Sequence, residues 1–214
     1  MNVISITAEA FLSNIFSWHW DELPRSILKH LAKVVNYNKI PDRVISDNEE
    51  VRSVVKWDRI EKMKMIRILV RCLDNDIDIM DQIHIEKFDY KIKHLTHLLS
   101  RKPHYIEHFK IDLSKITTSE AALVLSLGEQ YFLDKIDFGK YKFNFKESMN
   151  IIQGYGYDRE IIKKVNYKSL KGYQISEILI HTGEKNLDLF DTGKLTNIDW
   201  INLLALRPEL LKHC

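Results

Sequence analysis

The chain has 214 residues, of which 45% are hydrophobic and 29% charged, and its formal net charge is +2. This composition is too apolar for a disordered chain, and no apolar run approaches the roughly 20 residues that cross a membrane. The near balance of charge provides little long-range attraction for polyanions, so nucleic acid is not the favoured partner.

The N-terminus and the cysteines both indicate a cytoplasmic protein. The first residues lack a basic start followed by a long apolar stretch, so no signal peptide is predicted. Cys72 and Cys214 are far apart and do not form the dense framework that staples small secreted domains. No disulfide is expected.

Residues 1–54 are predicted to form a helical N-terminal cap. Two stretches, residues 8–12 and 27–32, are amphipathic at helical spacing. The polar stretch Ser46–Glu50 is a candidate linker, or alternatively the charged start of a helix.

Residues 55–214 contain about six tandem repeats with a period of about 27 residues. One position in each repeat, here called its anchor position, defines the alignment, and successive anchor positions are 28, 28, 25, 29 and 25 residues apart. Numbered as repeats 1 to 6, the anchor positions are Ile60, Phe88, Ile116, Tyr141, Leu170 and Leu195.

Each repeat opens with the same short pattern. The residue five before the anchor position is apolar in all six repeats, and the residue four before is polar. This alternation predicts a connector, either a brief extended stretch or a turn of 3₁₀ helix. The residue immediately before the anchor position is basic in five repeats, namely Arg59, Lys87, Lys115, Lys140 and Lys194.

A helix and a turn are predicted after each anchor position. An apolar pair follows eight or nine residues later, or slightly later in repeats 2 and 4, and a glycine or proline then falls in phase, as at Gly128 and Pro208. Glycine suits the end of a helix and proline the first turn of the next one. Because such short units bury their apolar faces only against neighbours, the sequence predicts an all-α fold of stacked helix-turn-helix repeats, an α-solenoid.

No residue pattern indicates catalysis, a cofactor or a metal. His104 and His108 have the spacing of zinc ligands, but no H-E-x-x-H motif is present. Gly154-Tyr155-Gly156 lacks the further residues of a phosphate-binding loop. The chain is therefore predicted not to be an enzyme, and no cofactor or metal site is predicted.

Two groups of residues are candidate partner contacts. The five basic residues that precede the anchor positions would form a ladder along one edge of a stack, although their stems could equally cover neighbouring apolar residues. Tyr155, Tyr157 and Trp20 are candidate aromatic contacts, because interface hot spots are rich in these residue types.

The stretch Asp199–Cys214 resembles tandem repeats of uncharacterised bacterial and phage-encoded proteins, which have the form D-W-x-x-L-L-x-x-x-P followed by a cysteine and then D-x-S-K-L. Residues 98–103 and 112–116 look like the same unit. The resemblance implies stacked repeats and a phage origin, with the host cytoplasm or the virion as the location, but no activity. A shorter likeness, to the repeats of mitochondrial transcription termination factors, implies nucleic-acid binding.

These observations favour a non-enzymatic repeat protein that mediates protein–protein interaction or structural assembly, including assembly with copies of itself. The alternative is a nucleic-acid-binding repeat protein that uses the basic ladder. No membrane partner is expected.

Overall fold

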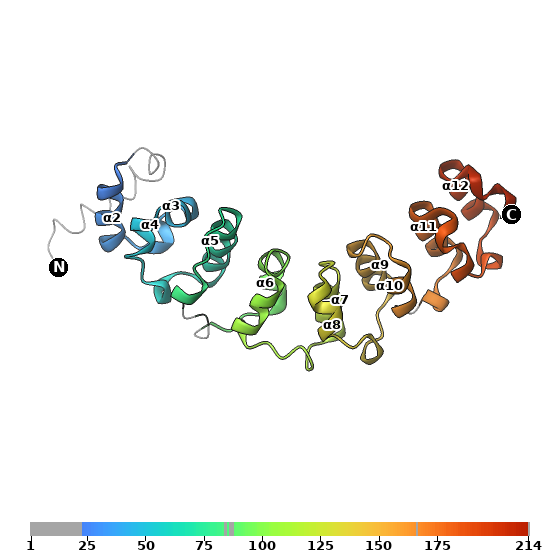
Figure 1. The fold of residues 1–214 in the computed structure, drawn as a ribbon, viewed down its shortest axis with the longest axis horizontal. Helices are drawn as coiled ribbons and strands as arrows, with labels where there is room; N and C mark the ends of the chain where they lie inside the picture. Colours follow the sequence, from blue (N-terminus) through green and yellow to red (C-terminus); the bar gives the residue numbers. More distant parts are fainter. Residues whose placement is uncertain (1–22, 84, 86–87, 166, 214) are drawn as a thin grey trace. The chain divides into compact units, whose positions relative to one another are not determined.

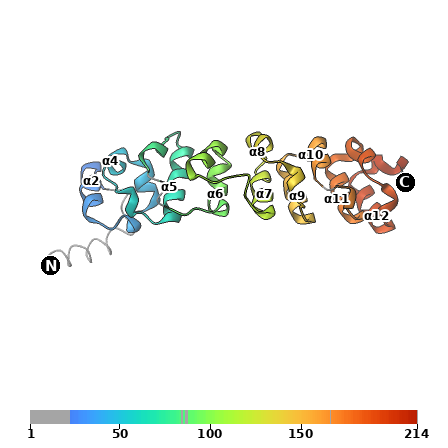
Figure 2. The same cartoon turned by 90° about the horizontal axis from the view of Figure 1, so that it is seen from below.

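The computed structural model describes residues 23–83, 85, 88–165 and 167–213. These residues form α-helices and 3₁₀ helices (η) with no strand among them, so the predicted all-α fold is confirmed. The chain divides into two compact units, residues 1–111 and residues 112–214, which we call the N-terminal half and the C-terminal half. Within each half, successive helices follow one another in chain order (Figures 1 and 2).

The described elements of the N-terminal half are α2 (Arg25–Val34), η2 (Tyr37–Lys39), α3 (Asp42–Asp47), α4 (Glu49–Arg52), η3 (Trp57–Arg59), α5 (Lys62–Asp74), η4 (Met80–Gln82), α6 (Ile92–Leu99) and η6 (Pro103–Phe109). Those of the C-terminal half are α7 (Thr118–Leu125), α8 (Gln130–Lys135), η7 (Phe138–Lys140), α9 (Phe145–Gly154), α10 (Arg159–Lys164), η8 (Tyr167–Ser169), α11 (Gly172–Thr182), η9 (Gly183–Leu189), η10 (Thr192–Lys194), α12 (Asn197–Leu206) and η11 (Pro208–His213).

The opening pattern of the repeat forms a 3₁₀ turn. In repeats 1, 4, 5 and 6, the three residues before the anchor position are η3, η7, η8 and η10, which confirms the connector interpretation. The polar residue four before the anchor position has a structural reason. In Asp112, Asp137 and Asp191, the side-chain Oδ1 accepts a hydrogen bond from the backbone N–H two residues later, at 3.0, 3.0 and 3.1 Å. The side chain thereby holds the turn.

The same connector occurs once more, upstream of residue 55. Asn36 Oδ1 accepts from the N–H of Asn38 at 3.0 Å, η2 follows, and Ile40 is fully buried at the anchor position. The helix pair α3 and α4 then completes this preceding copy. The stretch Ser46–Glu50 contains the end of α3, the capping residue Asn48 and the start of α4, so the linker prediction is wrong and the helical alternative is correct.

The core is built from the apolar pair in the long helix of each repeat. In repeats 2 and 4, the capping residue of that helix stands three positions after the anchor position, at Lys91 and Asn144, whereas Thr117, Lys171 and Thr196 follow their anchor positions directly. This shift makes Ile151-Ile152 the counterpart of Leu98-Leu99. The buried pairs are Ile68-Leu69, Leu98-Leu99, Val124-Leu125, Ile151-Ile152 and Ile178-Leu179.

Neighbouring repeats are joined by hydrogen bonds that span about one sequence period. The Tyr90 hydroxyl donates to the carbonyl of Lys62 at 3.2 Å, 28 residues away. Tyr141 donates in the same way to Leu113 at 3.4 Å, again 28 residues away. The period in the sequence therefore corresponds to contacts between adjacent repeats within each half.

Candidate functional surfaces

The predicted basic ladder is exposed where it is described. Arg59, Lys115, Lys140 and Lys194 all lie at the solvent-facing end of a connector, and Lys87 lies outside the described residues. Lys115 is paired locally with Asp112 at 2.9 Å. Hydrogen bonds from Ser114 and the neighbouring Lys115 ammonium hold the pKa of Asp112 at about 2. The charge of Lys115 is therefore partly balanced within its own connector.

Adjacent connectors contact one another within each half. Lys194 Nζ donates to the carbonyl of Lys168 in the preceding connector at 2.9 Å. In the N-terminal half, Asn38 Oδ1 accepts from the N–H of Glu61 at 2.7 Å, and its Nδ2 donates to the carbonyl of Arg59 at 3.4 Å. Arg59 and Lys194 thus lie on connectors that contact the preceding connector of the same half.

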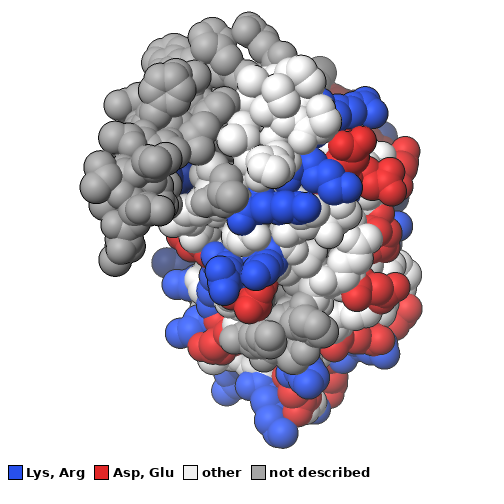
Figure 3. Space-filling model, turned by 90° about the vertical axis from the view of Figure 1, so that its left-hand side faces the viewer, with Lys and Arg blue, Asp and Glu red and all other residues white. Residues whose placement is uncertain are grey.

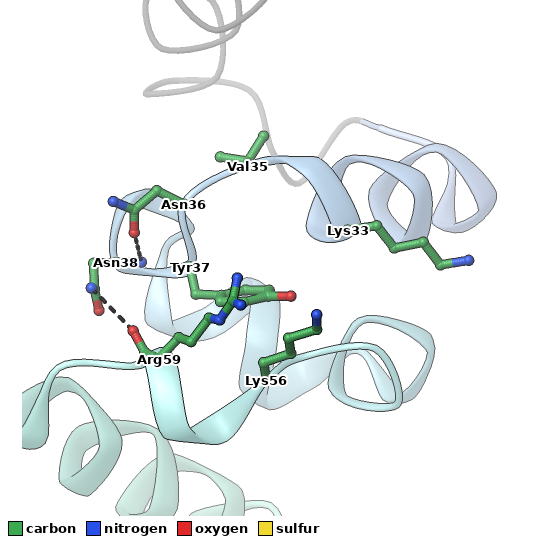
Figure 4. Close-up of a pocket in the computed structure, with 7 residues that line it drawn as sticks. All are labelled: Lys33, Val35, Asn36, Tyr37, Asn38, Lys56 and Arg59. Carbon is green, nitrogen blue, oxygen red and sulfur yellow. Dashed lines mark hydrogen bonds between the residues drawn. The ribbon is translucent and has the colours of Figure 1, made fainter. Parts of the chain in front are cut away.

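A basic pocket lies between two such connectors in the N-terminal half. It has a volume of about 420 Å³ and is lined by Lys33, Val35, Asn36, Tyr37, Asn38, Lys56 and Arg59. In Figure 4, Lys56 and Arg59 extend from the connector of repeat 1 beside Tyr37, and Lys33 comes from the end of α2. Among the residues that the structure describes, no carboxylate lines the pocket.

Three cations without a lining carboxylate can attract an anion such as a phosphate group. Seen from the end of the N-terminal half, Lys and Arg side chains gather toward the middle of the surface, and Asp and Glu lie more toward one edge (Figure 3). Only Arg59 of this pocket was a candidate from the sequence. Lys33 precedes the six repeats, and Lys56 stands at a position that is polar in every repeat without being regularly basic, so spacing alone could not single them out.

The candidate aromatic residues take part in the fold. The Tyr155 hydroxyl donates to the carbonyl of Glu129 at 2.9 Å, and burial raises the pKa of Tyr155 above its ordinary value. Tyr157 stacks on His181 with ring centroids 4.3 Å apart. Trp20 lies outside the described residues. Both tyrosines therefore have contacts inside the C-terminal half that account for their presence.

An apolar surface that the sequence did not reveal lies on repeat 6. Four large side chains of α12 and η11 are about two-thirds exposed: Ile198 at 70%, Ile201 at 67%, Leu206 at 64% and Leu211 at 66%. We call these four residues the end face. At about 100° per residue, Ile198 and Ile201 lie on the opposite side of α12 from Leu203, and of these three residues only Leu203 is buried.

Comparison between repeats shows why the end face is exposed. Ile201 stands six residues after its anchor position. Its counterparts Ile66, Ala122 and Ser176 are each only 4% exposed, because the long helix of the next repeat packs against each of them. Among the described residues, no further repeat packs on α12. A position that is interior in other repeats is therefore open to solvent in repeat 6.

Other chemistry receives no support from the described residues. They contain no group of three or more His, Cys, Asp or Glu side chains that could hold a metal ion. None of their helices combines the length and apolar character needed to span a bilayer. Cys72 is a buried free thiol, and burial raises its pKa to about 11.

Comparison of the chain with known protein families, curated proteins and solved structures finds no match.

Proposed function

We propose that this chain is a non-enzymatic helical-repeat protein, an α-solenoid, that binds another protein through the end face of repeat 6. One observation carries the proposal: Ile201 is 67% exposed, whereas its counterparts in three other repeats are 4% exposed. The residue type and position are those of an interior contact, and a partner would restore that environment.

The energetics favour coverage of this face. Full burial of a Leu or Ile side chain is worth about 1.5–3 kcal/mol, and four such side chains are grouped on α12 and η11. Ile198 and Ile201, three residues apart on α12, are neighbours on the helix surface, and contiguous exposed apolar surface marks interaction sites in soluble proteins.

The test compares capture of proteins by the tagged wild-type chain and by an Ile201→Asp variant from the native cells, with and without nuclease. The proposal requires a specific protein that survives nuclease and is lost with Ile201→Asp. Once that protein is identified and purified, its affinity should fall at least about tenfold in the variant, because a central apolar contact is worth more than about 1.4 kcal/mol.

Met63→Asp is the matched control, since Met63 is also an exposed apolar residue, at 37%, but lies on α5 in the N-terminal half. Its capture profile should equal that of the wild type. Equal loss of the partner in both variants, or retention in both, contradicts binding through the end face.

A second candidate function is nucleic-acid binding, favoured by the basic pocket, whose described lining residues include three cations and no carboxylate. The test is the affinity for DNA and RNA across salt concentrations, for the wild type and a Lys33→Ala, Lys56→Ala, Arg59→Ala triple variant. If the pocket binds phosphates, the salt dependence should be shallower in the variant, by about 0.9 in log–log slope for each duplex phosphate that is no longer bound. Identical slopes exclude this pocket as the nucleic-acid contact.

A further inference from the structure

We infer that the occupant of the end face is a helical hairpin of the same repeat kind as this chain, carrying a basic residue that pairs with Glu209. This inference rests on the proposed function and specifies the class of partner. It follows from how repeats 2 and 6 cover the repeats that precede them.

Repeat 6 shows how a hairpin covers the repeat before it. Its α12 packs against α11, and Ser176 Oγ of α11 donates to the carbonyl of Asp199 at 3.3 Å. Arg207 then reaches back to the end of α11, where Nε donates to the carbonyl of Ile180 at 2.5 Å and Nη2 to that of His181 at 3.1 Å. The contact thus combines apolar packing with a cation directed at the carbonyl end of the preceding helix.

An acidic residue stands at the border of this contact, fourteen residues after the anchor position, in repeats 1, 5 and 6, whereas repeats 2, 3 and 4 have Lys102, Gln130 and Tyr155 there. In repeat 1 this residue is Asp74, which pairs with Arg101 of repeat 2 at 3.3 Å. In repeat 5 it is Glu184, which pairs with Lys212 of repeat 6 at 2.7 Å. In both cases the cation comes from the following repeat.

Glu209 occupies this same position in repeat 6. Its side chain is 47% exposed, and the cation that it approaches is Arg207 of its own repeat, at 3.8 Å. Leu206, which follows its anchor position by the same eleven residues as His181, is also exposed. The end face therefore offers two features that a following repeat uses, an apolar centre and the carbonyl end of a helix. Glu209 stands at its border, with its Oε1 near Arg207 of its own repeat and Gly183 of repeat 5.

These features specify the chemistry of the occupant. It presents apolar side chains to Ile198 and Ile201, and it brings an Arg or Lys within reach of Glu209. A flat polar surface lacks the apolar complement, and an acidic segment would meet the carboxylate and the negative end of α12.

The experiment supplies such a hairpin in a defined register. A copy of residues 190–213 is appended directly after Cys214, so that the copied Leu195 falls 25 residues after the original, the same spacing that separates Leu170 from Leu195. The reporter is Ile201→Cys in a Cys214→Ser background, and the measurement is its alkylation rate. The buried Cys72 serves as an internal standard for the intact fold.

Docking of the copy should slow alkylation at position 201 at least about tenfold relative to the chain without a copy. A control copy in which the counterparts of Arg207 and Lys212 are both changed to Glu should slow it less. If circular dichroism shows that the appended copy adds no helix, a copy of residues 165–189 in the same register replaces it. Unchanged alkylation with both copies overturns the inference.

Two further results separate this inference from the proposed function. Sedimentation of the unmodified chain that shows a dimer abolished by Ile201→Asp would make a second copy of this chain the occupant and overturn the proposed binding of another protein. Failure to capture any partner from cells refutes the proposed function while leaving the alkylation result unaffected. Capture of a partner protein, together with an alkylation rate at position 201 that the appended copies do not change, refutes only the assignment of the partner as a helical hairpin.

Discussion

Gly128 and Gly154 bring the backbones of repeats 3 and 4 into contact: a methyl group added to Gly128 would lie 2.2 Å from the carbonyl oxygen of Gly154. Gly128 also has a φ of +76°, a conformation that residues with a side chain rarely adopt. A methyl group on Gly154 would in turn lie 2.4 Å from the carbonyl oxygen of Ser126. The turn after α7 thus packs directly on the end of α9.

Gly128→Ala should therefore destabilise the protein by about 3 kcal/mol or more, because left-handed strain of about 1–2 kcal/mol is added to the separation of two backbones. Gly156→Ala is the matched control, since Gly156 has a φ of +61° but no atom within 4 Å of the added methyl position. It should lose only about 1 kcal/mol. Urea unfolding measures the free energy of unfolding of both variants. Equal losses of stability would show that the contact between the two backbones does not contribute to it.

Ile66 and Ile201 stand at the same position of two repeats and should respond in opposite ways to a charge. Ile66→Asp buries an unpaired carboxylate between α5 and α6 and should cost at least about 4 kcal/mol. Ile201→Asp leaves the carboxylate in water and should change the free energy of unfolding by less than about 1 kcal/mol. Thermal unfolding of the two variants provides the measurement. A large loss for Ile201→Asp would mean that α12 is covered within the chain.

The sequence predicts the all-α fold, the connectors and the buried pairs, because each depends on local spacing. The apolar pair of α9 is harder to place from spacing, since the cap Asn144 shifts the helix by two residues. The preceding copy at Val35–Ile40 conforms to the connector pattern but is followed by an anchor position only 20 residues later, at Ile60, so a period of about 27 does not include it.

The candidate surfaces were much less predictable than the fold. Whether Ile201 is interior depends on the presence of a following repeat, and nothing in the residue itself distinguishes it from Ile66. The basic pocket combines Lys33, from the end of α2, with Lys56 and Arg59 of a later connector, while α2 packs against α4. Periodicity in the sequence indicates which face of each helix is apolar, but not which other elements pack against that face. The end face and the basic pocket could therefore be identified only from the structure.

Acid should weaken the contact between α3 and α5 through Asp47. Two hydrogen bonds from Arg71, at 3.0 and 2.7 Å, lower the pKa of Asp47 below its ordinary value of 3.8, against a smaller opposing effect of burial. The pKa of Asp47 is lower in the folded protein than in the unfolded chain. The stabilisation from the ionised carboxylate is therefore complete above about pH 4 and is lost as the pH falls through the pKa of Asp47 in the folded protein.

The measurement is the free energy of unfolding of wild type and Asp47→Asn between pH 6 and pH 2. Both side chains are more than 40% exposed, so the difference at pH 6 should be at most about 1 kcal/mol in favour of the wild type. This difference in the free energy of unfolding should shrink toward zero as the pH falls below 3.8, the ordinary pKa of the Asp47 carboxyl group. A difference that is constant across this range would exclude the ionised pair as its source.

Cys72 should be inert in the folded protein. Its side chain is fully buried in α5, its Sγ lies 3.8 Å from the carbonyl oxygen of Ser46, and burial raises the pKa of the thiol to about 11. Alkylation requires the thiolate, so at pH 8 both the burial and the raised pKa suppress the reaction. In a Cys214→Ser background, labelling should follow the unfolded fraction and reach the rate of a free thiol only above the urea transition.

Rapid labelling of Cys72 in the absence of denaturant would show that α5 separates from α3 in the folded state. Such a result would also remove the basis for using Cys72 as an internal standard.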